Sequence, residues 1–280
     1  MHSKLMTKTA MCLAASTLAM AAGHAEAVPV AVLLTDSSAI ITHTGNIGAS
    51  VDTRVIDVPM IPSIVVGGAV PLQYNLFPPI SNGLASSNGR AGIASATSPT
   101  TFGLQFAPTT LLTQRGNTNT SPSTASVLRY DFNASWLIQG TAFGPGSMAG
   151  LQLSLVASVP NSSAAFVEVT SGINFSYTLG GTTLLRSDIV PLPAIYLRTA
   201  PGSEIATRSN IAAALPGTLA VGAVVSVSGY LQFRVHNDGT EASVELLNGS
   251  VSPTDALAIP APGAMAMLAG AGLLATRRRR

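Results

Sequence analysis

Apolar and polar residues alternate along four stretches of the sequence. The longest stretch runs from Val127 to Ile138, where most of the alternate side chains are large and apolar. Because successive side chains of a strand point to opposite faces of a sheet, this period of two predicts a strand with one buried and one solvated face. The other three stretches lie at residues 151–155, 173–179 and 225–235. Together they predict long antiparallel strands.

Two glycine-containing turns predict how these strands are connected. Asn237-Asp238-Gly239 separates the last of them from a further strand at residues 242–247, and therefore predicts a β-hairpin. Gly180-Gly181 predicts a second hairpin, between the strand at residues 173–179 and one at residues 182–190.

The first third of the sequence is less regular. Residues 30–35, 38–43 and 64–70 are predicted strands. Residues 81–100 and 113–126 are rich in Gly, Ser, Thr, Asn and Pro, and are predicted loops. We expect the early strands to complete the later sheets, because they could hardly form a core alone.

Helical spacing is confined to one short segment, residues 209–215. Several strands with frequent turns and no helical crossovers favour an all-β fold, either an antiparallel β-sandwich or a jelly-roll-like domain. We predict a single exported domain at residues 28–258. Two domains with a boundary within residues 113–126 are the alternative.

The N-terminus has the order of a cleavable secretory signal peptide: basic residues, an apolar stretch and then small residues. Ala25 and Ala27 supply the small side chains that a signal peptidase accepts before its cut. We therefore predict a signal peptide at residues 1–27 and a mature N-terminus at Val28. The apolar stretch is shorter than the about 20 residues of a permanent membrane helix.

The C-terminus combines prolines, an apolar run and a basic end. Pro260, Ala261 and Pro262 precede the uncharged residues 263–276. With a rise of about 1.5 Å per residue this run would span about 21 Å as a helix, less than the about 30 Å of a bilayer core. It predicts a short transmembrane helix, transient or permanent, with the domain outside and the basic end in the cytoplasm. The basic end is Arg277, Arg278, Arg279 and Arg280.

Residues 259–280 resemble the PEP-CTERM sorting signal of exported bacterial proteins, with Ala261 in place of the glutamate of the family motif. The resemblance implies recognition at Pro260, Ala261 and Pro262 by an exosortase-like sorting enzyme, followed by removal of the tail. It also implies delivery to the cell envelope, the cell surface or the extracellular matrix. A one-span anchor that keeps its four arginines as a stop-transfer cluster is the alternative.

Charge and cysteine content narrow the possible functions. Residues 28–276 contain eight Arg, no Lys and eleven acidic residues, a net charge of −3. The arginines are scattered singly, whereas nucleic-acid binding needs a clustered basic face, so we exclude nucleic acid as a partner. Cys12 lies in the predicted signal peptide, which excludes disulfides, thiol catalysis and cysteine-bound metal in the mature chain.

The sequence shows no motif for a catalytic, metal or cofactor site. His43 and His236 are far apart and form no zinc-binding pair, and the G-x-S-x-G elbow of a serine hydrolase is missing. We therefore predict a noncatalytic protein without cofactor or metal. The paired carboxylates of a glycosidase stay open, because the fold and not the sequence spacing brings them together.

Aromatic residues separate two hypotheses about function. Tyr130, Phe132 and Trp136 share the apolar phase of their strand, which predicts burial, whereas Tyr230 occupies a polar phase and is predicted to be exposed. Our leading hypothesis is a noncatalytic envelope or matrix protein. The alternative is a surface-displayed domain that binds or cleaves carbohydrate, with a polysaccharide as partner, and it requires two or more exposed aromatics or two facing carboxylates.

Overall fold

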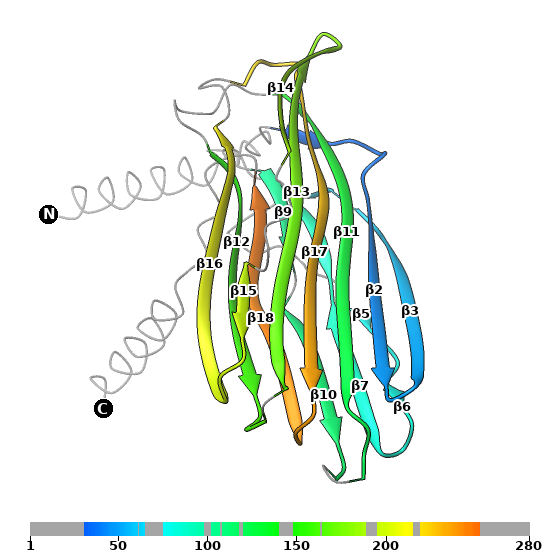
Figure 1. Cartoon of the computed structure of the whole chain (residues 1–280). Helices are drawn as coiled ribbons and strands as arrows, with labels where there is room; N and C mark the ends of the chain where they lie inside the picture. Colours follow the sequence, from blue (N-terminus) through cyan, green and yellow to red (C-terminus); the bar gives the residue numbers. More distant parts are fainter. Residues whose placement is uncertain are drawn as a thin grey trace, which may run out of the picture.

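The computed structural model describes a two-layer β-structure (Figure 1). It describes residues 31–60, 62–64, 75–97, 102–106, 108–117, 120–139, 148–162, 164–188, 195–214 and 219–252. Throughout these ranges all regular structure is β-strand, which confirms the predicted all-β fold with two sheets. The predicted signal peptide and the predicted sorting segment lie outside the described residues.

One layer, sheet A, has eight strands in the order β14-β13-β17-β11-β2-β3, with β1 beside β11 and β15 beside β13. All of its strand pairs are antiparallel. Its strands are β1 (Ala31–Leu33), β2 (Ser38–Ile47), β3 (Ser50–Pro59), β11 (Thr124–Ile138), β13 (Phe166–Leu179), β14 (Thr182–Asp188), β15 (Tyr196–Arg198) and β17 (Val224–Asn237).

The other layer, sheet B, has ten strands, among which β4-β8-β9-β18-β10-β7-β5 form the main path. β12 joins β18 and carries β16 on its other side, and β6 pairs with β7. Among the described strand pairs of this sheet, only β4 and β8 are parallel. The strands are β4 (Pro62–Ile64), β5 (Asn75–Leu76), β6 (Ile80–Ser81), β7 (Ala85–Ala91), β8 (Ile93–Thr97), β9 (Phe102–Phe106), β10 (Thr109–Arg115), β12 (Met148–Val159), β16 (Gly202–Ala214) and β18 (Glu241–Ser252).

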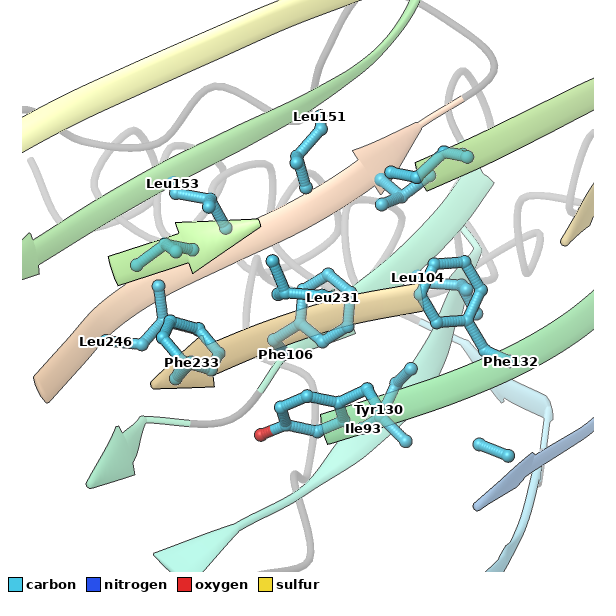
Figure 2. Packing of buried hydrophobic residues seen from close by; sticks show 14 of the residues in the cluster. Ile93, Leu104, Phe106, Tyr130, Phe132, Leu151, Leu153, Leu231, Phe233 and Leu246 are labelled. Carbon is cyan, nitrogen blue, oxygen red and sulfur yellow. The ribbon is translucent and has the colours of Figure 1, made fainter. Parts of the chain in front are cut away.

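The core lies between the sheets and is built from the apolar phases of the alternating strands. Tyr130, Phe132 and Trp136 are buried, as their phase predicts. Figure 2 shows Tyr130 beside Phe106 of β9 and Phe233 of β17; the Phe106 and Tyr130 ring centroids are 5.1 Å apart. Each large apolar side chain that folding removes from water stabilises the folded chain by about 1.5–3 kcal/mol. The core between the sheets therefore supplies the main driving force for folding.

Three strands of the predicted pattern, β11, β13 and β17, form the centre of sheet A. The Gly180-Gly181 hairpin between β13 and β14 is also confirmed, since Leu179 pairs with Thr182. Both glycines have positive φ, 58° and 80°, as a tight two-residue hairpin turn requires.

The hairpin predicted at Asn237-Asp238-Gly239 is wrong. β17 belongs to sheet A and β18 to sheet B, so this turn carries the chain from one layer to the other. The amide of Asn237 holds the turn: its Oδ1 accepts a hydrogen bond from Gly239 N at 2.9 Å, and its Nδ2 donates one to Thr113 O at 3.2 Å. A Cβ on Gly239 would lie 2.6 Å from Pro160, so glycine serves close packing here.

Two further predictions, one from composition and one from helical spacing, are also wrong. The predicted loop at residues 81–100 contains strands β7 and β8, and the predicted helix at residues 209–215 overlaps β16. In β7 every second residue points inward and is small. These residues, all of them buried, are Ala85, Ser87, Gly89 and Ala91. Side chains of the opposite sheet occupy the space that these residues leave: a Cβ on Gly89 would lie 3.1 Å from the His43 ring.

Candidate functional site

The outer face of sheet A carries a group of polar and aromatic side chains. They project from the three central strands, β11, β13 and β17, on the side opposite the core. We call this surface the outer strip and define it by Arg129, Asp131, Phe166, Glu168, Tyr230, Arg234 and His236.

Tyr230 lies in the middle of the outer strip, on the face that its strand phase predicts, but it is half-buried and not exposed as predicted. It stands opposite Asp131 on β11 and Gly172 on β13. A Cβ on Gly172 would come within 2.8 Å of the ring atom Cε1, so the missing side chain makes room for the ring beside β13. The guanidinium of Arg129 lies over the ring, with Cζ 4.3 Å from its centroid, a cation–π contact.

Arg129 is held in this position by Asp131, two residues further along β11. Its Nε lies 2.9 Å from Oδ2, and its Nη2 lies 2.7 Å from Oδ1. These hydrogen bonds raise the pKa of Arg129 above its usual value, so the guanidinium stays charged. The result is a planar cation of fixed orientation on an aromatic ring, with both side chains of the ion pair about 40% exposed.

A second aromatic group lies toward the end of the strip where β17 leaves sheet A. The rings of Phe166 and His236 stack with centroids 5.5 Å apart and planes inclined by 23°. Arg234 lies over Phe166 with Cζ 5.1 Å from its centroid and faces Glu168 across the strands, where the nearest N–O distance is 3.7 Å. His236 is half-buried by this stacking.

The outer strip repeats one arrangement twice: an aromatic ring, an arginine over it and a carboxylate beside the arginine. Tyr230 and His236 are six positions apart on β17, which corresponds to about 20 Å along a strand. Each carboxylate, Asp131 or Glu168, is paired with an arginine and not with the other carboxylate. The strip is therefore polar, aromatic and balanced in charge, and it does not show the facing carboxylates that glycan cleavage requires.

A histidine and two serines meet inside the sandwich, in a combination that hydrolases use. His43 Nε2 lies 2.8 Å from Ser87 Oγ, and Ser126 Oγ donates a hydrogen bond to Ser87 Oγ at 2.5 Å. All three residues are fully buried, so no substrate reaches them. In addition, His43 Nδ1 has no hydrogen-bond partner among the described residues, whereas a catalytic triad holds this atom with a carboxylate.

The environment of His43 favours the neutral imidazole. Burial, and secondarily the nearby Arg54, lower the pKa of His43 to about 4, while Asp52 acts in the opposite direction. We therefore interpret the His43, Ser87 and Ser126 cluster as a polar link between the two sheets. The sequence offered one signal for it, since His43 shares the strand phase of Ala39 and Ile41.

The structure does not test the predictions made for the two ends of the chain. Ala25, Ala27 and Val28, the Pro260-Ala261-Pro262 motif and the four terminal arginines lie outside the described residues. Within the described ranges, no three His, Cys, Asp or Glu residues gather closely enough to hold a metal ion. The same ranges contain no helix with the length and apolarity of a membrane span.

Comparisons with known proteins add no relative. A scan against protein-family models, a search of curated proteins and a search of solved structures each returned no match.

Proposed function

We propose that this chain is a noncatalytic exported protein whose β-sandwich is delivered to the cell envelope or the extracellular matrix through its C-terminal sorting signal. The observation that carries the proposal is the pair of residue patterns, at residues 1–27 and 259–280, that predict a signal peptide and a sorting signal. The described strands begin at Ala31 and end at Ser252, so removal of both signals would leave every described strand in place.

Intact-mass measurement of the full-length chain, expressed in a bacterium that has an exosortase, tests the sorting step. We expect material from the cell surface and the medium to begin at Val28 and to lack Arg277–Arg280. Replacing Pro260 and Pro262 with alanine should leave the tail attached, because the proposed recognition motif is lost. The control Pro253→Ala removes a proline outside the motif and should be processed normally. Retention of the four arginines in every fraction of the unaltered chain would contradict the proposal.

The outer strip favours a second function, the binding of a polysaccharide. A sugar ring presents an apolar face of C–H groups bordered by hydroxyls, which suits aromatic rings flanked by hydrogen-bonding groups. Phe166 and Tyr230 provide two half-buried aromatic rings on one sheet face, and the arginines that lie over them provide donors together with the acceptors of their paired carboxylates. The charge balance of the strip favours a neutral polymer over an anionic one.

Replacing Tyr230 with leucine should weaken binding of a neutral polysaccharide about tenfold, the equivalent of about 1.4 kcal/mol for an aromatic contact. Leucine keeps an apolar cover over Gly172 but removes the flat ring. The measurement is affinity electrophoresis in hydroxyethyl cellulose, with alginate as the anionic comparison. The control Ile205→Ala alters an exposed residue of sheet B and should leave mobility unchanged. Equal retardation of all three chains in hydroxyethyl cellulose would refute binding through the strip.

A further inference from the structure

Strand β3 forms one border of sheet A (Figure 1). It pairs with β2 over all ten residues, from Ser50 to Pro59, without a register shift. Among the described strands, none pairs with its other edge. Half of its backbone N–H and C=O groups therefore face away from the sheet, in an arrangement that can pair with another strand.

The position of the hairpin turn indicates which residues direct these groups outward. β2 and β3 are joined by Gly48 and Ala49, and Ile47 pairs with Ser50 next to the turn. In antiparallel pairs, alternate residues bond to the neighbouring strand. Counting from Ser50, the even-numbered residues bond to β2, and Val51, Thr53, Val55 and Asp57 present their groups to the free edge. Within a single copy, Thr53 N donates a hydrogen bond to Asp52 Oδ1 at 2.8 Å, which pairing with a second strand would replace.

The side chains of this edge are complementary to themselves. Asp52 and Arg54 lie on one face of β3, where they form an ion pair at 2.6 Å with both side chains about 40% exposed. Val51 and Val55 lie on the other face and are 65% and 59% exposed. Thr53 lies between these pairs, so a two-fold axis through Thr53 would exchange Asp52 with Arg54 and Val51 with Val55.

We propose that two copies of this chain associate through the free edges of β3, antiparallel, with the two-fold axis at Thr53. In this register Asp52 of each copy faces Arg54 of the other, and Val51 faces Val55. Opposite charges and β-branched residues directly across an antiparallel pair are both stabilising. The same patch on both copies forms the contact, as a closed two-fold dimer requires.

Other arrangements satisfy these side chains less well. An axis at Val55 would place Arg54 opposite Ile56 and Asp52 opposite Val58, which leaves both charges without an opposite partner. The register centred on Thr53 therefore gives both charges of the β3 edge an opposite partner.

A single cysteine tests both the contact and its register. In a Cys12→Ser background the chain has no other cysteine, so Thr53→Cys can form a disulfide only with a second copy. Residues directly opposite in such a pair have Cα atoms about 5.5 Å apart, within the range that a disulfide bridges. We expect Thr53→Cys to give a covalent dimer on a non-reducing gel after mild oxidation.

The matched control is Val55→Cys on the same edge. In the proposed register its own counterpart lies four positions away, about 13 Å along the strand. Val55→Cys alone should therefore stay monomeric on the gel, whereas a mixture of Val51→Cys and Val55→Cys chains should cross-link. Equal cross-linking of Thr53→Cys and Val55→Cys would overturn the proposal, and so would the absence of cross-linking with Thr53→Cys. This holds even if light scattering shows a dimer, because that dimer would then form through another surface.

Charge exchange supplies an independent test. Asp52→Arg and Arg54→Asp each place like charges across the axis, and each should raise the dissociation constant of the dimer at least about tenfold. An equimolar mixture of the two variants should dimerise again, because each chain then faces the opposite charge. Light scattering over a concentration series measures both effects. This proposal does not depend on the outer strip, and a mixture that stays monomeric would contradict it.

Discussion

Replacing Gly229 with alanine will destabilise the sandwich by about 4 kcal/mol or more, which is at the extreme of single substitutions. Gly229 lies in the middle of β17 with φ of +152°. A Cβ at this position would be 2.0 Å from the carbonyl oxygen of Gly172 on β13. Because β17 is paired with β11 on its other side, it cannot move away from β13 without disturbing a second ladder.

Urea denaturation followed by the fluorescence of Trp136 measures this loss, since Trp136 is the single tryptophan of the chain and is fully buried. The control is Gly180→Ala in the β13–β14 turn. Gly180 also has positive φ, but no atom lies within 4 Å of an added Cβ. It should cost only about 1 kcal/mol of conformational strain. Similar losses in the two variants would show that close backbone packing at Gly229 is not decisive.

The sequence predicts the strands whose inward residues are large. Leu128, Tyr130 and Phe132 alternate with polar residues, and this pattern locates β11 within a few residues of its observed bounds. β7 alternates as well, but between small buried residues and polar ones, a pattern that composition alone cannot distinguish from a loop. Whether this segment forms a strand depends on the bulky side chains of the opposite sheet that pack against it, and the local sequence does not reveal them.

The pairing of strands is harder to predict than their existence. Asn237-Asp238-Gly239 has the composition of a hairpin turn, yet the strands on either side enter different sheets. The choice depends on partners far away in the sequence: β17 lies between β11 and β13, and β18 pairs with β10 and β12. A local turn signal carries no information about these partners.

The sequence predicts only part of the candidate site, because it does not reveal how the strands pair. The strand phase of Tyr230 indicates its place on the solvated face, and alternation puts Arg129 and Asp131 on one face of β11. The proximity of Tyr230 to Arg129, and of Phe166 to His236, follows from the register between strands. That register is set by the buried side chains of the whole sheet, so the outer strip becomes visible only in the folded chain.

Acid will destabilise this protein through His43. The pKa of His43 is about 4 in the folded chain and about 6.5 in the unfolded chain. Between these pH values the unfolded chain therefore binds the proton more readily than the folded chain. Stability contributed by the neutral, buried ring is therefore complete above about pH 6.5 and is lost as the pH falls to about 4. At about 1.4 kcal/mol per pH unit, the loss amounts to about 3 kcal/mol.

Urea denaturation at several pH values between 7 and 4 tests this, with His43→Gln as the variant. Glutamine can still hydrogen-bond to Ser87 but does not titrate, so the free energy of unfolding should fall by about 3 kcal/mol less over this range than in the unaltered chain. The two chains differ only at residue 43, so the comparison isolates the contribution of His43. If His43→Gln loses as much stability in acid as the unaltered chain, the buried ring is not the group that senses the proton.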